Sequence, residues 1–353
     1  MKIGMIFPGQ GSQVLGMGKE IYDRERCVQE SFEQASQCLD QNFVRLCFAS
    51  SDRELRETVN AQTSIFLVSS SLYSLLNTKY GIVPDVVAGH GSGEYAAIFA
   101  AGGINFADAL YLLKKRATFM EDAALAQPGS MIGVVGLSLD ILNEICRRYD
   151  DPTGMTKVAE IVNYDAPEQL VVSGTLPELE LVTKEVLMTG AKVNPLNVTG
   201  AFHSRLMREA GKQLALYMVK VDLKDLTRPL INNVAAQPIT EHTELKESLI
   251  QQVSSHVLWW PSMAHFESCD VIIEVGPSNG FAKILQREWP TKQIFSFSTP
   301  ADLEQILQFF GKEVEKTELA LDLEEIQEEP KSSDKQQSND SRHSDDLIKP
   351  NNT

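Results

Sequence analysis

Cysteine is scarce in this chain of 353 residues, and the few thiols that it has follow no pattern. An odd number of scattered cysteines, with no closely spaced pair, argues against a disulfide framework and against a zinc site. We therefore expect reduced and mostly buried thiols, no metal centre, and a cytoplasmic location. The cysteines are Cys27, Cys38, Cys47, Cys146 and Cys269.

Long apolar runs are also lacking. No window of about 20 residues is apolar enough to cross a membrane. The apolar run at residues 1–7 is too short for a secretory signal and has no small-residue cleavage site after it. The sequence therefore predicts a protein without membrane association, and residues 3–7 instead predict a short buried strand.

Basic residues are too few for a general nucleic-acid binder. Lys and Arg number 32 against 48 Asp and Glu, a formal charge of −16, whereas displacing counterions from nucleic acid needs a net basic face. Twelve of the acids and five of the bases lie in residues 313–353, which contain no aromatic residue. We expect this segment to be an acidic, largely disordered tail. The 43% hydrophobic and 23% charged content of the whole chain is typical of a soluble globular protein.

The stretch VVAGHGSGEYAAI at residues 86–98 is the feature around which the rest is organised. An apolar run, a glycine-rich turn and a helix-prone segment follow one another without a gap. This order is typical of a nucleophile elbow, in which glycines let the backbone bend sharply enough to lift one side chain above a sheet. The usual spacing puts the nucleophile at Gly91, but the only hydroxyl of the turn belongs to Ser92.

A second glycine-rich loop, Pro8-Gly9-Gln10-Gly11, follows the first expected strand. Its spacing matches neither the P-loop nor the dinucleotide fingerprint. Two interpretations stay open, a backbone-rich loop beside a ligand or a plain turn.

The pattern changes between residues 129 and 198. Four apolar segments there predict strands and two periodic segments predict helices, in the order β-α-β-β-α-β, which is ferredoxin-like. We expect an inserted α+β subdomain at 129–198 within a large α/β-hydrolase-like domain, formed by residues 1–128 and 199–312, whose sheet is mostly parallel. The expected strands are 131–137, 157–164, 169–174 and 191–197, and the expected helices are 139–149 and 177–189.

Seven blocks, in order from about residue 3 to about residue 300, together resemble the malonyl-CoA:acyl-carrier-protein transacylases, including the discrete acyltransferases of polyketide synthases. They are FPGQGSQ, AGHGSGEYAA, FADAL with KKRATFM, QLVVSG, GAFHSRLM, NNVAAQP and IIEVGP. In that family a serine attacks the malonyl thioester, a histidine takes its proton, and the acyl group then passes to the phosphopantetheine thiol of an acyl-carrier protein. The resemblance implies malonyl-CoA and an acyl-carrier protein as partners, no cofactor, and a monomer.

The resemblance also implies roles for individual residues in the chemistry. His203 matches the base, because a hydroxyl is a poor nucleophile without one. The backbone amides of Gln10 and Ser92 match the oxyanion hole, which needs preset donors. Gln252 matches the glutamine that orients the histidine through its main-chain carbonyl.

Other positions match the part of the family site that binds substrate. Arg116 matches the arginine that grips the malonyl carboxylate, a task that needs a fork of two donors. Phe202 resembles the malonyl-type specificity residue, whose bulk leaves little room for a methyl branch. His90 matches a histidine that we interpret as structural or as a support of the site. The donor phosphates and the carrier would need a local basic rim, for which the candidates are Lys114, Lys115 and Arg205.

The chain departs from the family at the nucleophile, where the pattern Gly-His-Ser-any-Gly is replaced by Gly-His-Gly-Ser-Gly. One step along a helix turns a side chain by roughly 100°, so an unaltered backbone would point Ser92 away from the position of the family serine. Either the glycine at Gly91 lets Ser92 swing into that position, or the site has lost covalent chemistry and keeps binding.

We predict malonyl transfer from coenzyme A to an acyl-carrier protein through a seryl ester at Ser92, in fatty acid or polyketide synthesis. The active cleft should lie between the two subdomains. One alternative is a catalytically impaired scaffold that still binds malonyl-CoA or the carrier. Another is an acyl hydrolase of polyketide carriers, although its substrates would usually lack a carboxylate for Arg116 to bind.

Overall fold

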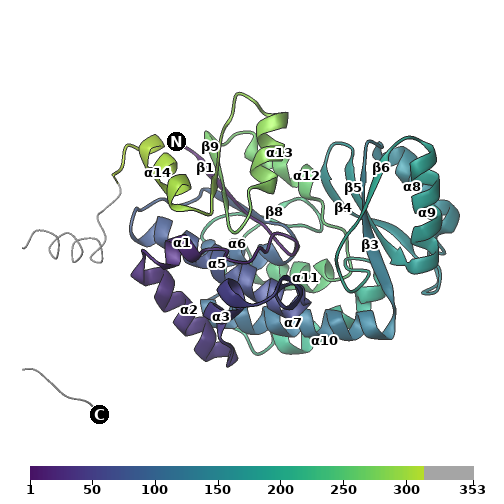
Figure 1. Cartoon of the computed structure of the whole chain (residues 1–353), viewed down its shortest axis with the longest axis horizontal. Helices are drawn as coiled ribbons and strands as arrows, with labels where there is room; N and C mark the ends of the chain where they lie inside the picture. The colour runs from purple at the N-terminus through teal and green to yellow at the C-terminus, as the bar shows by residue number, and fades with distance from the viewer. Residues whose placement is uncertain (314–353) are drawn as a thin grey trace, which may run out of the picture. The chain divides into compact units, whose positions relative to one another are not determined.

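The computed structural model describes residues 1–313, which fold around two β-sheets (Figure 1). The acidic tail predicted at 313–353 lies almost wholly outside the described residues, so its disorder stays a prediction. No helix within residues 1–313 has both the length and the apolar character needed to cross a membrane.

The larger sheet has six strands in the order β10-β9-β1-β2-β7-β8. All neighbouring strands are parallel except β7 and β8, so the predicted mostly parallel sheet is confirmed. The strands are β1 (Ile3–Phe7), β2 (Val86–Gly89), β7 (Leu230–Ile231), β8 (Pro238–Ile239), β9 (Val271–Val275) and β10 (Gln293–Phe297).

Helices pack on both faces of this sheet. The longest are α5 (Thr58–Thr78) and α7 (Phe106–Ala126). The others are α1 (Lys19–Tyr22), α2 (Arg26–Leu39), α3 (Phe43–Ala49), α4 (Asp52–Arg56), α6 (Glu94–Ala100), α10 (Arg208–Met218), α11 (His242–Gln252), α12 (Trp259–Met263), α13 (Gly280–Glu288) and α14 (Pro300–Phe309), with the 3₁₀ turns η1 (Gly91–Gly93), η2 (Arg205–Met207) and η3 (Ala264–Phe266).

The central strand β1 is buried along its whole length, as expected for a parallel strand covered on both faces. Its side chains alternate between two cores because successive residues of a strand point to opposite faces. Met5 and Phe7 belong to the core that contains α5 and α7, whereas Ile6 belongs to the core beneath α12 and α13.

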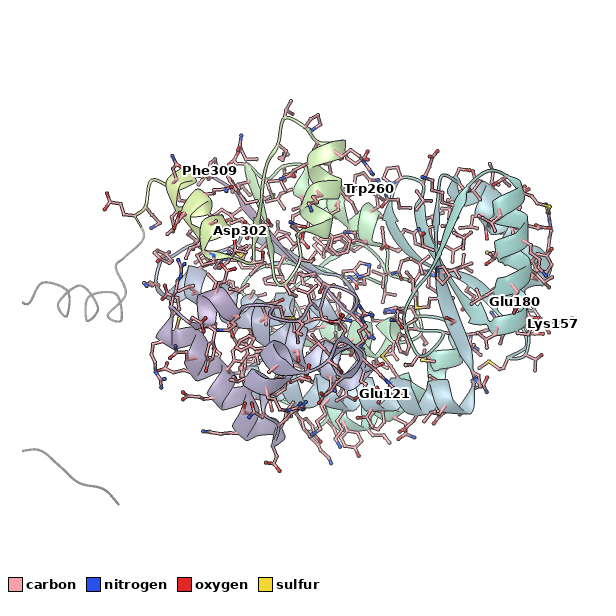
Figure 2. All side chains as sticks on the ribbon, in the orientation of Figure 1. Glu121, Lys157, Glu180, Trp260, Asp302 and Phe309 are labelled. Carbon is pink, nitrogen blue, oxygen red and sulfur yellow. The ribbon has the colours of Figure 1, made fainter. Side chains whose placement is uncertain are left out.

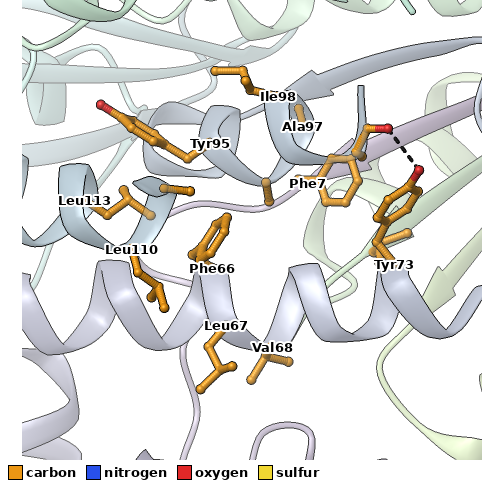
Figure 3. Packing of buried hydrophobic residues seen from close by; sticks show 14 of the residues in the cluster. Phe7, Phe66, Leu67, Val68, Tyr73, Tyr95, Ala97, Ile98, Leu110 and Leu113 are labelled. Carbon is orange, nitrogen blue, oxygen red and sulfur yellow. Dashed lines mark hydrogen bonds between the residues drawn. The ribbon is translucent and has the colours of Figure 1, made fainter. Parts of the chain in front are cut away.

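Figure 3 shows the core between β1, α5, α6 and α7. The Phe7 and Tyr73 rings meet edge to face, with 6.3 Å between their centroids, and the Tyr73 hydroxyl donates to the carbonyl of Ala100 at 2.9 Å. Burying a side chain of this size contributes about 1.5–3 kcal/mol. This core therefore fixes α5, α6 and α7, three of the helices that bring polar side chains to the site described below.

The last helix of the sheet domain, α14, begins with a capping box. Thr299 Oγ1 accepts a hydrogen bond from the Asp302 amide, and the Asp302 carboxylate accepts one from the Thr299 amide (Asp302 is labelled in Figure 2). These bonds satisfy donors that every helix start leaves free.

The smaller sheet is antiparallel, with the order β4-β5-β3-β6, and two helices cover one of its faces. The predicted ferredoxin-like arrangement is therefore confirmed, although its first strand begins two residues earlier than predicted and ends before Gly136, whose φ of +95° breaks the strand. The elements are β3 (Gly129–Val135), α8 (Leu139–Tyr149), β4 (Ala159–Ala166), β5 (Gln169–Thr175), α9 (Leu176–Met188) and β6 (Lys192–Pro195).

Backbone hydrogen bonds attach strand β4 of the smaller sheet to the segment that precedes α12. The Val257 amide donates to the carbonyl of Val162 at 2.7 Å, and the Tyr164 amide donates to the carbonyl of Val257 at 3.1 Å. Asp165, near the end of β4, lies 2.8 Å from Nε2 of His90, the residue directly after β2. The end of β4 therefore lies beside the carboxyl end of β2, where open α/β sheets usually place their ligands.

Candidate active site

The elbow connects β2 to α6 and needs glycine at two of its positions. A Cβ on Gly89 would lie 2.2 Å from backbone atoms of Gly93 and Glu94, and a Cβ on Gly93 would lie 2.4 Å from the carbonyl oxygen of Phe7. No side chain fits at those distances. These two glycines let the chain turn tightly against β1.

Gly91 occupies the apex of the elbow. Its φ of +55° lies in the left-handed region, which residues with side chains seldom adopt and which is found at strained turns of functional sites. A Cβ built on Gly91 would meet His203 Nε2 at 3.4 Å, with no other residue closer. Position 91 therefore faces the imidazole, as the family spacing predicts for the nucleophile.

Ser92 is buried, and its side chain points to a different partner. Its Oγ accepts a hydrogen bond from the Gln10 amide at 3.1 Å, and in the described chain it makes none with His203. The Gln10 amide is one of the two donors expected for the oxyanion hole. The role of Ser92 as nucleophile stays a prediction, and it requires this hydroxyl to leave Gln10.

The loop that carries Gln10 lies directly on the elbow. A Cβ on Gly9 would come within 2.0 Å of the His90 carbonyl oxygen, so only glycine permits this approach. Of the two interpretations of this loop, the structure supports a backbone-rich segment beside a candidate site.

His203 lies in the segment between β6 and η2, with a φ of +63° that is unusual for a residue with a side chain. Its Nδ1 lies 2.9 Å from the carbonyl oxygen of Gln252. Because a carbonyl can only accept, Nδ1 carries the proton and Nε2 keeps the lone pair that faces Gly91. Burial of the ring, followed by the nearby positive charge of Arg116, lowers the pKa of His203 to about 3, so the ring is a neutral proton acceptor at neutral pH.

Arg116 projects from α7 and is almost completely buried. Its two terminal nitrogens donate to Gln62 Oε1 at 2.8 Å and to Gln252 Oε1 at 2.9 Å, whereas its Nε has no partner. No carboxylate of residues 1–313 forms an ion pair with it, and burial lowers its pKa. A buried guanidinium without a direct ion pair is costly, and its fork is suited to a carboxylate.

Gln252, the last residue of α11, forms hydrogen bonds with both His203 and Arg116. Its carbonyl oxygen holds His203, its Oε1 holds Arg116, and its Nε2 donates to the carbonyl of Gly91 at 2.9 Å. The structure thus brings Gln252 and His203 together through the main-chain carbonyl that the resemblance indicates.

A cavity of about 70 Å³ joins these groups. Residues from both subdomains line it, including Met131 and Asn163 from the smaller sheet. It therefore lies between the subdomains, and a larger cavity of about 590 Å³ also reaches His203. The predicted site residues that line the smaller cavity are Gln10, His90, Ser92, Arg116, Phe202 and His203.

His90 faces the smaller sheet rather than His203. Its Nε2 lies 2.8 Å from Asp165 Oδ1, and its ring packs against Trp259 and Phe281. The residue thus links the elbow to the end of β4. This placement agrees with a supporting role, which stays a prediction.

The prediction that Arg205 belongs to a basic rim is wrong. Its side chain is buried, forms ion pairs with Asp150 and Glu160, and donates to three backbone carbonyls. Lys114 donates to the carbonyl of Leu39, and the Lys115 ammonium lies 4.9 Å from the Tyr217 ring centroid. Arg205 lines the larger cavity, but its donors are taken up by residues 150–160 and are not left free for a ligand.

Three polar residues of this site are not among the residues predicted from the sequence. Gln62 lies in the middle of α5 with no motif around it, Asn233 lies in the NNVAAQP block, and Glu94 directly follows the elbow. The two blocks give a signal for Asn233 and Glu94, but nothing in the sequence marks Gln62. Within residues 1–313 no group of three or more His, Cys, Asp and Glu side chains could hold a metal ion.

Residues 5–296 match the model of the acyl transferase domain family. The malonyl CoA-acyl carrier protein transacylase of Bacillus subtilis (strain 168) is 34% identical over 315 residues, covering 88% of this chain and 98% of that protein. Its counterpart in Staphylococcus aureus (strain MRSA252) is 31% identical and covers 86% and 97% of the two chains.

Solved structures give the same result. An acyl-carrier-protein S-malonyltransferase from Burkholderia pseudomallei 1710b superposes with a TM-score of 0.82 at 33% identity, covering 87% of this chain and all of the other. A malonyl-transacylase solved in complex with its type II polyketide synthase acyl-carrier protein has a TM-score of 0.82 at 26% identity, with 88% and 100% coverage.

Proposed function

The chain belongs to the acyl transferase domain family, and from this membership and the site we propose that it transfers a malonyl group from malonyl-CoA to the phosphopantetheine thiol of an acyl-carrier protein. Relatives that are named as malonyl transacylases, one of them in complex with its carrier protein, support this reaction in fatty acid or polyketide synthesis.

The observation that carries the proposal is Arg116. Two neutral amide oxygens hold its guanidinium in the small cavity, and no carboxylate of the described chain forms an ion pair with it. A malonyl thioester supplies the missing anion at one end and a reactive carbonyl at the other. Phe202 lines the same cavity, and its bulk supports the choice of malonyl over branched substrates.

The proposed chemistry proceeds through a seryl ester. Ser92 rotates away from Gln10 and gives its proton to His203 Nε2 while Oγ bonds to the thioester carbon; the C–S bond breaks and the sulfur of coenzyme A takes the proton. The carrier thiol then gives its proton to His203, its sulfur attacks the ester, and Ser92 Oγ recovers a proton as the C–O bond breaks. The Gln10 amide, released by Ser92, can then bind the oxyanion.

The proton transfers and bond changes of this scheme involve only Ser92, His203 and the two thiols, so we propose no metal or redox cofactor. We also propose that the protein acts as a monomer and that it lies in the cytoplasm. Its scattered, free cysteines support the cytoplasmic location.

A second function is favoured by one observation, the glycine that faces His203. With no hydroxyl at position 91, the chain would bind malonyl-CoA or the carrier without transferring the acyl group. An acyl hydrolase is disfavoured because Arg116 would then have no carboxylate to bind.

Intact-protein mass spectrometry after incubation with malonyl-CoA separates these functions. Transfer through Ser92 predicts a gain of one malonyl group, which disappears on addition of a phosphopantetheinylated carrier protein. No gain and no malonyl carrier, with tight binding of malonyl-CoA, would support the binding protein instead.

A further inference from the structure

Glu94 is a buried carboxyl group next to the site that the proposed chemistry does not use. It is the first residue of α6, directly after the elbow, and it is 0% exposed. No cation of the described residues forms an ion pair with it. Burial raises its pKa to about 8, although hydrogen bonds from Asn233 and Gln252 and the charge of Arg116 oppose this rise. Burying an ionisable group costs free energy, so a buried carboxyl group at this position suggests a specific role.

The two oxygens of Glu94 accept hydrogen bonds from two fixed donors. Oε1 accepts from the Asn233 amide at 2.9 Å, and Oε2 accepts from Gln252 Nε2. Asn233 is itself fixed on the elbow, because its Oδ1 accepts from the Gly91 amide at 2.8 Å and its Nδ2 donates to the carbonyl of Gly89 at 2.7 Å. One end of the carboxyl group is therefore tied to the backbone of the turn.

The other end reaches Arg116 through a single amide group. Gln252 presents its NH₂ group to Glu94 and to the carbonyl of Gly91, and this leaves its Oε1 facing the guanidinium at 2.9 Å. Glu94 thus holds the amide of Gln252 without touching Arg116. The fork of the guanidinium stays available, which a direct ion pair with Glu94 would prevent.

We infer that Glu94 is the positioning residue that makes this site selective for acyl groups with a carboxylate, by fixing Gln252 in the orientation that aims Arg116 into the cavity. The inference rests on the proposed role of Arg116. It concerns the affinity for the carboxylate and not the transfer step.

Replacement by glutamine is the sharpest test, because it keeps the shape and removes one acceptor. Two N–H donors point at the two oxygens, and a glutamine can accept from only one of them. The backbone amide of Asn233 cannot move away, so the new glutamine accepts from it and turns its own NH₂ group toward the NH₂ group of Gln252. The side chain of Gln252 can rotate to relieve this contact between two donors. Its Oε1 would then leave Arg116.

The experiment measures the dissociation constants of malonyl-CoA and acetyl-CoA by titration calorimetry at a pH above the pKa of Glu94, so that its carboxyl group is ionised and both of its oxygens accept. Every protein carries Ser92→Ala, so that acylation cannot intervene. The parent should bind malonyl-CoA more tightly than acetyl-CoA. Glu94→Gln should reduce this preference about tenfold, the loss expected for one hydrogen bond to a charged group. Affinity for acetyl-CoA should change less than twofold, a difference that a general structural defect would not produce.

Glu274→Gln is the matched control. Glu274 is also a fully buried carboxyl group, and it accepts from a backbone amide, that of Ala282, and from the Ser278 hydroxyl, but it does not contact Gln252 or Arg116. Its substitution should leave the preference unchanged. An unchanged preference in Glu94→Gln would overturn the inference, whereas a parent without any preference would overturn the role of Arg116 itself.

If Glu94→Gln does not fold, Glu94→Asp provides the same test. Aspartate keeps both acceptors but withdraws them by one methylene group, so the grip on Gln252 weakens. The preference for malonyl-CoA should fall here too, and an unchanged preference in a folded Glu94→Asp would equally overturn the inference.

Discussion

Gly91 and His203 face each other across the elbow, with 3.4 Å between the position of a Cβ at residue 91 and the Nε2 that carries the lone pair. A serine side chain at residue 91 would place its hydroxyl within reach of that nitrogen. The base and the apex of the turn are thus arranged for a nucleophile that the sequence does not supply at that position.

Gly91→Ser should therefore create a direct nucleophile. We expect malonylation of the protein at least about 100-fold faster than in the natural chain, the contribution typical of a positioned general base. Rapid-quench mass spectrometry with malonyl-CoA measures this rate. Because a side chain at a φ of +55° is strained, the free energy of unfolding should fall by about 1–2 kcal/mol. A rate no faster than that of the natural chain would contradict this geometry.

Ser92→Ala tests the other hydroxyl of the turn. If Ser92 is the nucleophile, the malonyl adduct and the transfer to the carrier both disappear. The free energy of unfolding should fall by only about 1 kcal/mol, the value of the single hydrogen bond from Gln10. Ser12→Ala is a suitable control, because this hydroxyl bonds only to the carbonyl of Gly9 in the neighbouring loop. An adduct that survives in Ser92→Ala would move the acylation to another residue.

The sequence predicts the framework of this site because each part leaves a local pattern. Short apolar runs mark the strands, and the close backbone approaches at Gly89 and Gly93 require glycine, so the turn can be recognised from residue types alone. The spacing even indicates that residue 91, and not residue 92, occupies the apex.

The polar connections behind the site could not be predicted. Gln62, Asn233 and Glu94 come from three separate elements, and they act only because the fold brings them to Arg116, Gln252 and the elbow. A glutamine in a buried helix has no periodicity that separates it from a surface residue. Arg205 shows the converse error, since a basic residue beside a motif turned out to be an internal ion-pair partner.

The pH dependence of stability should report on His203. In the unfolded chain the ring binds a proton near its ordinary pKa of 6.5, but in the folded protein only near 3. Between these pH values the unfolded state binds more protons than the folded state. The contribution of the neutral His203 ring to the free energy of unfolding is therefore fully present above pH 6.5 and is lost as the pH falls toward 3. Urea unfolding at pH 7 and pH 5 should show a larger loss for the natural chain than for His203→Gln. Equal losses would mean that the imidazole is not held neutral.

Arg116→Lys tests the carboxylate grip. Lysine keeps the charge, but its single ammonium cannot hold Gln62 and Gln252 and also present a fork to a carboxylate. We expect the affinity for malonyl-CoA to fall at least about tenfold, as for the loss of one charged hydrogen bond, with the affinity for acetyl-CoA nearly unchanged. Arg148→Lys is the control, because Arg148 is exposed on the smaller subdomain, where one of its terminal nitrogens donates to both carboxylate oxygens of Glu185. Equal losses for both ligands would show that Arg116 supports the fold of the cavity rather than the recognition of a carboxylate, and the case for a malonyl substrate would then rest on the relatives alone.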